Sequence, residues 1–265
     1  MSYTPIELYN DGIHKCLMFS DLSEGEGVQS NQFLLVDAKD FALIDPGGDL
    51  SYSALALEIS KRYVLSELTY IFASHQDPDI ISSLDRWLLH TQCQIVAPRI
   101  WSRFLPHLAS EYVNQTLEGS VFDRIIAVPD EGMSIPFGGS KVLCLPAHFL
   151  HSAGNIQFYD PISKILFSGD LGASMIPNHG EEMFVNRFDE HIPLMEGFHK
   201  RYMTSNKACR MWAKMIRHLD IEWVVPQHGK IFKGKENIDA LYQWIEGLEC
   251  GVDLLQDQDF SIPEW

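Results

Sequence analysis

The chain has 265 residues, of which 46% are hydrophobic and 21% are charged, a composition typical of a globular protein that buries a core without disulfide bonds. Its formal charge of −16 argues against nucleic acid and anionic membranes as partners, because an acidic surface repels phosphate groups. No apolar run reaches membrane-spanning length, and the amino terminus lacks the basic and apolar regions of a signal peptide. The five cysteines are scattered without a Cys-x-x-Cys pair, which predicts reduced thiols and a cytoplasmic protein.

The first half of the sequence is rich in predicted strands. Residues 31–36 and 41–44 flank Asp37-Ala38-Lys39-Asp40, which predicts a hairpin, and Asp45-Pro46-Gly47-Gly48 ends its second strand. Beyond this turn, the pattern of apolar residues predicts an alternation of helices and strands. They are a helix over 52–62, a strand over 68–73, a helix over 79–90, a strand over 94–97 and a helix over 98–105.

The second half continues this alternation less strictly. It predicts strands over 124–128, 141–145, 156–159, 165–167 and 223–225, and helices over 189–204, 206–218 and 236–248. No Gly/Ser/Pro-rich linker interrupts the chain, so we expect a single domain over residues 1–265 with a loosely held acidic tail over 253–265. Strands mixed with helices in both halves predict an α+β fold, in which two sheets carry helices on their outer faces.

Acids and histidines follow four of the predicted strands. The candidates are His75, Asp77 and Asp79 after the strand at 68–73, His151 after 141–145, Asp170 after 165–167, and His228 after 223–225. Side chains of this kind, released at several strand ends, are how a scaffold gathers distant residues around one metal centre. Imidazole and carboxylate groups together suit iron or manganese at least as well as zinc.

Each candidate also has a purely structural interpretation. Asp79 is a good helix-capping residue, Asp170 fits a turn, and His228 fits a loop. Two histidines follow the strand at 141–145, and His151 is preferred over His148 because it opens the tight loop before the next strand. The matching contexts of the four clusters favour a shared role as metal ligands over four unrelated structural roles.

Together these motifs resemble the metallo-β-lactamase superfamily. Its first metal motif is His-x-His-x-Asp-His after a strand, and here His75, Asp77, Asp79 and Ile80 hold its four positions. An acid in the second position resembles the flavodiiron branch, whose motif is His-x-Glu-x-Asp-His and which binds two iron ions. The resemblance implies a four-layer αββα sandwich, and the similarity of the loop from residue 150 to 155 supports His151 as the ligand.

The resemblance also implies how the ligands divide between two iron ions. His75, Asp77 and His151 would hold one ion, Asp79 and His228 the other, and Asp170 would bridge the two. Ile80 replaces a histidine that commonly binds the second ion, so that ion would keep open positions for water or a diatomic gas. The other nearby histidines, expected at the surface or beside the ligands, are His90, His148 and His179.

The chain shows no GxGxxG fingerprint and no flavodoxin domain, so we expect no flavin in it. In this it resembles the stand-alone oxygen-binding diiron proteins, some of which are sensors for chemotaxis. We therefore expect O2 to bind the diferrous centre and to persist as a peroxo or diferric state, which suits an oxygen or redox sensor. The resemblance further implies a homodimer, and a chemoreceptor or another signalling protein as partner.

Two other interpretations stay open, and a third, an interaction module with an inactive site, is disfavoured because ligand residues are present in all four clusters. The same site would make an O2 or NO reductase if a separate protein supplied electrons. A zinc-dependent hydrolase of the same fold is the second alternative, and there the metal would activate a hydroxide. Asp77 in a position usually held by histidine, and Ile80 nearby, both argue against zinc.

Overall fold

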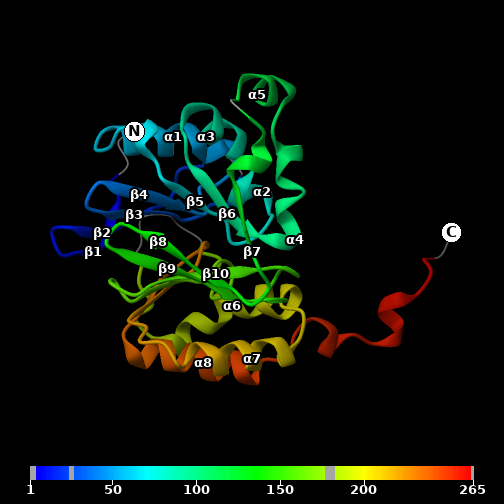
Figure 1. Cartoon of the computed structure of the whole chain (residues 1–265). Helices are drawn as coiled ribbons and strands as arrows, with labels where there is room; N and C mark the ends of the chain where they lie inside the picture. The colour runs from blue at the N-terminus through cyan, green and yellow to red at the C-terminus, as the bar shows by residue number, and fades with distance from the viewer. Residues whose placement is uncertain (1–3, 24–26, 118, 177–182, 264–265) are drawn as a thin grey trace.

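The structure, a computed structural model, describes residues 4–23, 27–117, 119–176 and 183–263. Two β-sheets lie face to face, and helices cover the outer face of each sheet (Figure 1). The predicted four-layer αββα arrangement is confirmed. None of the helices within the described ranges combines the length and the apolar character needed to cross a bilayer.

The first sheet has seven strands in chain order. They are β1 (Ile6–Asn10), β2 (His14–Phe19), β3 (Gln32–Asp37), β4 (Asp40–Ile44), β5 (Tyr70–Phe72), β6 (Gln94–Pro98) and β7 (Ile125–Val128). Strands β1 to β4 pair antiparallel, whereas β4 to β7 run parallel. The loops that follow β4 and β5 therefore leave from the same edge of the sheet.

Short helices connect the parallel strands of the first sheet, and α1 and α3 lie over its outer face (Figure 1). The α-helices are α1 (Asp49–Ser60), α2 (Pro78–Ile81), α3 (Leu84–His90), α4 (Arg99–Ser102) and α5 (Glu111–Thr116). The 3-10 turns are η1 (Leu65–Glu67), η2 (Leu105–Leu108) and η3 (Val121–Arg124).

The second sheet has six strands in the order β13-β12-β11-β10-β9-β8. They are β8 (Met133–Phe137), β9 (Ser140–Pro146), β10 (Ile156–Asp160), β11 (Ile165–Phe167), β12 (Trp223–Val225) and β13 (Phe232–Lys233). The parallel pair β11 and β12 releases its following loops at one edge. Three long helices cover the outer face of this sheet: α6 (Phe188–Tyr202), α7 (Asn206–Ile216) and α8 (Lys235–Gly247).

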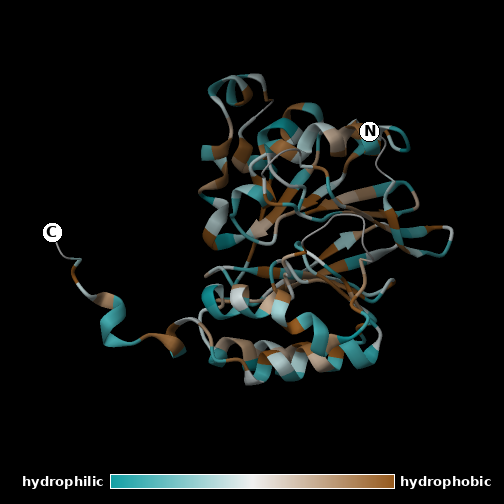
Figure 2. Ribbon diagram, turned by 180° about the vertical axis from the view of Figure 1, so that it is seen from behind, coloured by the Kyte–Doolittle hydropathy of each residue, from teal (hydrophilic) through white to brown (hydrophobic). Residues whose placement is uncertain are grey.

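Aromatic side chains join the two sheets across the interior. Phe33 contacts Phe167, and Phe72 contacts Phe158, each pair with ring centroids 5.1 Å apart and edge-on geometry. The strands of both sheets carry most of the hydrophobic colour in Figure 2, while the exposed helix faces are mixed. This rigid double sheet fixes the loops at its edge, where the candidate metal ligands lie.

Two predicted helices are wrong in extent. The helix predicted over 79–90 is broken into α2 and α3. At the break, the Ser83 hydroxyl donates to the Gly47 carbonyl at 2.6 Å, a contact outside the helix. The helix predicted over 98–105 ends at Ser102 and continues as η2. The described elements that the sequence prediction missed are β1, β2, α5, β8, β13 and the 3-10 turns. In β8, Pro136 explains the omission, since proline lowers the expectation of a strand.

Candidate metal centre

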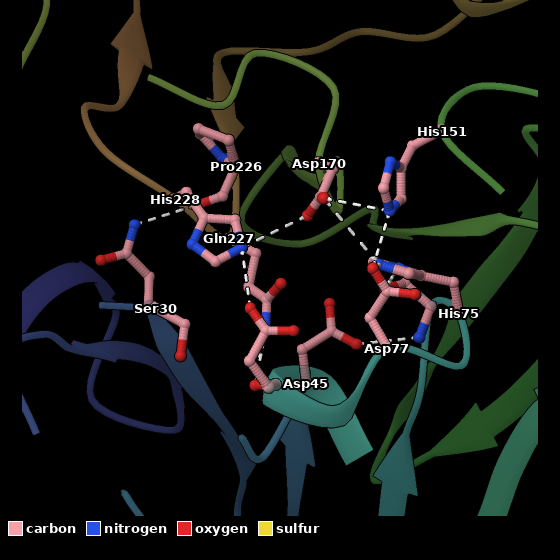
Figure 3. A network of polar contacts seen from close by, with 12 residues as sticks. Ser30, Asp45, His75, Asp77, His151, Asp170, Pro226, Gln227 and His228 are labelled. Atoms are coloured by element: carbon pink, nitrogen blue, oxygen red, sulfur yellow. Dashed lines mark hydrogen bonds and ion pairs between the residues drawn. The ribbon is translucent and has the colours of Figure 1, made fainter. Parts of the chain in front are cut away.

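The predicted ligands lie at one edge of the double sheet, where strands from both sheets end. His75 follows β5, His151 lies in the loop between β9 and β10, Asp170 follows β11, and His228 follows β12. Figure 3 shows these side chains converging on one space, with Asp170 between His151 and His228. Strand ends that are far apart in sequence thus deliver one polar cluster into the edge of an apolar core.

The segment that follows His75 turns two acids toward the cluster. Asp77 is the N-cap residue of α2, Pro78 occupies the first turn, and Asp79 lies inside the helix. The Asp77 side chain makes no capping hydrogen bond. Helix capping, the structural alternative considered for Asp79, is not its role, because Asp79 lies inside the helix and not at its N-cap.

One group of the cluster contains His75, Asp77, His151 and Asp170, whose potential ligand atoms all lie within 4.8 Å of one another. The Asp77 Oδ2 atom lies 2.8 Å from His151 Nε2 and 3.7 Å from His75 Nε2. The Asp170 Oδ2 atom lies 3.5 Å from His151 Nε2 and 3.9 Å from His75 Nε2. Two imidazole nitrogens and two carboxylate oxygens thus face a common point.

The second group shares Asp170 with the first. His228 Nε2 lies 3.3 Å from Asp79 Oδ2 and 3.6 Å from Asp170 Oδ1. The two oxygens of Asp170 therefore face different groups, Oδ2 the first and Oδ1 the second. A carboxylate in this position is placed to serve two cations at once.

Unusual backbone conformations hold two of these loops in place. His151 has φ of 78°, in the region that favours glycine, and this directs its ring into the cluster. Gly169, just before Asp170, has φ of 56°, and a β-carbon there would lie 3.3 Å from Ser74 Oγ. The glycine lets the Asp170 loop pass close to the β5 loop.

Hydrogen bonds orient the histidine rings from behind. The Asp45 Oδ1 atom accepts from the Ser74 backbone N–H at 2.8 Å, and Ser74 Oγ lies 2.9 Å from His75 Nδ1. His228 Nδ1 donates to the Gln29 carbonyl at 2.7 Å. In both rings the Nε2 atom is the one left to face the acids, which is how metal-binding histidines are commonly oriented.

The electrostatic environment lowers the pKa of Asp77 and Asp79 and raises that of His228, so the cluster attracts positive charge. Burial lowers the pKa of His228, but the Asp79 hydrogen bond and the charge of Asp170 outweigh it and raise this pKa to about 9. Burial raises the pKa of Asp77, but the hydrogen bond with His151 and the nearby His75 ring outweigh it and bring that pKa well below its usual range. A metal cation satisfies the same electrostatic demand without protons.

Buried polar atoms without partners also fit a cation. His75 Nε2 and Asp170 Oδ1 are buried and make no hydrogen bond. Leaving such an atom unsatisfied costs about 1–3 kcal/mol. In the neutral His228 ring with its proton on Nδ1, the Nε2 lone pair faces the carboxylates of Asp79 and Asp170, which repel it. A cation between these three groups would be bound by all of them.

Sequence reasoning missed His199, which supports the Asp170 loop from α6. Its Nε2 accepts from the Gly172 backbone N–H at 2.9 Å, and its Nδ1 donates to the Met195 carbonyl at 2.9 Å. Burial lowers the pKa of this ring to about 4, so it is neutral. A helical histidine carries no local sequence signal for such a contact, because Gly172 is distant in the chain.

The other histidines considered from the sequence lie elsewhere. His90 is exposed, and His148 donates to the Asp130 carbonyl at 2.7 Å. His179 lies outside the described residues. Ile80 is fully buried in the hydrophobic core under α1 and α3, so its side chain offers no ligand atom.

The chain matches a known family over most of the region that builds this cluster. The model of the family described as ODP family beta lactamase matches residues 28–229. The chain belongs to this ODP family. The matched range includes all six predicted ligands, together with the strands of both sheets that position them.

Solved structures of the chemotaxis sensor ODP are similar to this chain over nearly their full length. The apo state of the sensor from T. denticola is 38% identical with a TM-score of 0.83, covering 96% of this chain and 98% of that one. A peroxy diiron species of chemotaxis sensor ODP is 37% identical with a TM-score of 0.81, covering 94% and 97% of the two chains. The 37% identical structure is thus one of a sensor with a diiron centre in a peroxy state.

More distant relatives are longer than this chain. A mutant of a flavo di-iron protein from Thermotoga maritima is 21% identical with a TM-score of 0.73, covering 92% of this chain and 60% of that one, which shows a common fold. Uncharacterized protein MJ0732 of Methanocaldococcus jannaschii is 25% identical over 227 residues. This match covers 82% of the present chain and 53% of the relative. The chain therefore spans about half the length of that curated relative.

Proposed function

We propose that this ODP-family chain holds two iron ions and binds O2 as an oxygen or redox sensor. The ligands of the first ion are His75, Asp77 and His151, those of the second are Asp79 and His228, and Asp170 bridges the two. The observation that carries the proposal is the position of Asp170, whose two oxygens face different ligand groups at 3.5 Å and 3.6 Å.

The donor set favours iron over zinc. Three carboxylates and three imidazoles make an oxygen-rich site, whereas zinc in proteins is bound mainly by histidine and cysteine. The chemotaxis sensor ODP, 37% identical to this chain, has been solved as a peroxy diiron species. Its likeness to this chain supports both the metal and the gas.

The second ion has room for O2. It has two ligands of its own and a share of Asp170, while the position after Asp79 holds the buried, apolar Ile80. A cavity of about 290 Å³ lies beside His228 and is lined by residues that include Gln29, Ser174 and Met183. Two ferrous ions would supply the electrons that O2 binding draws on, and this cavity would let a small gas approach the His228 side of the centre.

Signalling is the role that this arrangement suits. The chain shows no flavin fingerprint that would mark a resident electron source, so a centre that binds O2 and stays oxidised reports the presence of the gas. The solved ODP relatives are described as chemotaxis sensors. We therefore propose a cytoplasmic homodimer that acts on a chemoreceptor or another signalling protein.

Anaerobic loading with ferrous iron tests the proposal. The expected result is two iron ions per chain and a new visible absorption after a single addition of O2. Stopped-flow mixing with excess O2 and a generic reductant is expected to give one oxidation and no sustained O2 consumption. Rapid multiple turnover would instead identify a reductase. Retention of two zinc ions in preference to iron, with no change in visible absorption after air exposure, would identify a hydrolase-like centre.

A further inference from the structure

Residues 251–263, the C-terminal arm, leave the body of the molecule and run away from α7 (Figures 1 and 2). The base of the arm is fixed to Thr204, just before α7, and to Asn206, the first residue of α7. Val252 donates its backbone N–H to the Thr204 carbonyl at 2.9 Å, and Asp253 Oδ2 accepts from the Asn206 N–H at 2.5 Å. The arm thus has a defined point of departure.

Beyond this base, the hydrogen bonds of the described arm stay inside it. The Gln256 N–H donates to Asp259 Oδ2 at 2.8 Å, and the Asp259 N–H donates to the Gln256 carbonyl at 2.9 Å. Phe260 and Ile262 are 77% and 87% exposed. The arm therefore has local structure of its own. A hollow of about 820 Å³ lies between the arm and α6 and leaves room for another chain.

An apolar groove of about 680 Å³ runs along the exposed face of α7. The apolar residues that line this α7 groove include Ala147, Phe149, Ala208, Met211 and Met215, and its charged lining residues are Lys207 and Asp130. Phe149 is 51% exposed and Met211 is 66% exposed. No residue of the described arm lines this groove, although the base of the arm lies close by at Thr204. Exposed apolar surface of this kind marks an interaction site.

The charges of the arm and of α7 are opposite. Across its 11 residues α7 carries Lys207, Arg210 and Lys214 and no acid, in a chain whose net charge is −16. The arm carries Asp253, Asp257 and Asp259 and no lysine or arginine over residues 251–263. Asp257 and Asp259 stand close to the exposed Phe260 in the sequence, so the arm combines apolar and acidic side chains, as α7 combines an apolar groove with basic side chains on the same helix.

We infer that the C-terminal arm of one copy binds the α7 groove of a second copy, and that the second copy returns the same contact. Phe260 and Ile262 would fill the apolar groove, while Asp257 and Asp259 would pair with Lys207 and Arg210. The exchange obeys two-fold symmetry, since each copy offers one arm and one groove. This inference rests on the homodimer proposed above and names the surface that forms it.

Charge reversal in the iron-loaded, full-length protein tests this pairing by sedimentation equilibrium. The wild type is expected to be a dimer whose affinity falls as salt is raised. Asp257→Lys/Asp259→Lys and Lys207→Glu/Arg210→Glu should each weaken the dimer at least about tenfold. An equimolar mixture of the two variants should restore it, because each reversed arm then meets a reversed groove.

Lys39→Glu/Lys141→Glu is the control matched to Lys207→Glu/Arg210→Glu, since it makes the same charge change on exposed residues away from the arm and α7, and it should leave the dimer intact. A monomeric wild type, a dimer that both arm and groove variants leave unchanged, or a mixture that stays monomeric would overturn the inference. Iron content and the spectral response to O2 are measured on the same samples. If both are as expected while the dimer results fail, the arm contact is wrong and the diiron proposal stands.

Discussion

Two clusters of histidine and aspartate lie at opposite ends of β10. His151 precedes the start of the strand at the candidate metal centre, and Asp160 ends it at the other cluster. There, His14 Nε2 of β2 lies 2.7 Å from Asp160 Oδ2, and His14 Nδ1 lies 3.9 Å from Asp37 Oδ2. The His14 cluster is buried and the candidate metal centre is partly buried, and both join the two sheets, so composition alone does not distinguish them.

Hydrogen bonding distinguishes the two clusters. Asp160 accepts from the Ser163 backbone N–H at 3.0 Å and also from the Ser163 hydroxyl, and Asp37 accepts from the Gly139 N–H at 2.8 Å. In the candidate metal centre, Asp170 Oδ1 has no such donor. Carboxylates satisfied by fixed backbone donors form a structural ion pair, whereas a carboxylate such as Asp170, whose Oδ1 has no donor and faces His228, is arranged for a cation.

Asp170→Asn should produce the largest effect, because it removes the charge that both groups share. We expect the affinity for each iron ion to fall by more than about 100-fold, since loss of a mere partner of a ligand already costs 10–100-fold. Anaerobic titration against a chromogenic chelator measures this loss. Asp160→Asn is the control at the other cluster and should keep two ions bound. Wild-type affinity in Asp170→Asn would remove the basis for a bridging role.

Asp160→Asn should instead reduce folding stability. Removing one partner of a buried ion pair leaves the other charge uncompensated, and we expect a loss of about 3 kcal/mol in the free energy of unfolding. Urea denaturation of the metal-free protein measures it. Asp170→Asn should lose less in the same assay, because Asp170 Oδ1 accepts no hydrogen bond there. Equal losses in the two variants would contradict the distinction between the clusters.

Asp45→Ala should weaken iron binding more modestly, by about tenfold, because Asp45 is hydrogen-bonded to Ser74 and not to the His75 ring itself. The first ion should be affected more than the second. Asp45 has φ of 49°, where alanine is strained, so Asp45→Asn is the matched variant. Asparagine keeps an oxygen acceptor for the Ser74 N–H and should retain most of the affinity. A full loss in Asp45→Asn would mean that the charge of Asp45, and not its hydrogen bond, matters.

The sequence was sufficient to predict the layers of the fold and the convergence of the candidate site. Strand-ending His75, Asp170 and His228 are visible because each follows an apolar run, and parallel strands must release their loops at one edge. The break between α2 and α3 was not visible, since it depends on a hydrogen bond from Ser83 to the distant Gly47. Periodicity reports which face of a helix is buried but carries no information on such contacts.

The cluster of His14 and Asp160 shows the limit of sequence reasoning at a site. His14 and Asp160 are 146 residues apart, and neither stands in a motif. Their pairing follows from the register of β2 and β10 in two different sheets, which no local pattern encodes. The same limit applies to His199, whose contact with the Asp170 loop depends on where α6 crosses the second sheet.

The smallest effect concerns the pH dependence of the His14 cluster. Burial lowers the pKa of His14, but Asp160, Asp37 and Asp11 outweigh it and raise this pKa above its usual value near 6.5. The contribution of His14 to stability is therefore complete below about pH 6.5 and is lost as the pH rises through its raised folded value. At the acid end, burial raises the pKa of Asp160, but the hydrogen bond with His14 outweighs it and lowers that pKa. Asp160 therefore loses its contribution as the pH falls below about 4.

The difference in unfolding free energy between wild type and His14→Gln should be greatest between these limits and should shrink toward pH 9. Urea denaturation of the iron-loaded proteins across this range measures it, with the ligand histidines held deprotonated by the metal in both. A difference that stays constant from pH 5 to 9 would show that His14 is uncharged in the folded chain, and that its bond to Asp160 is an ordinary neutral one.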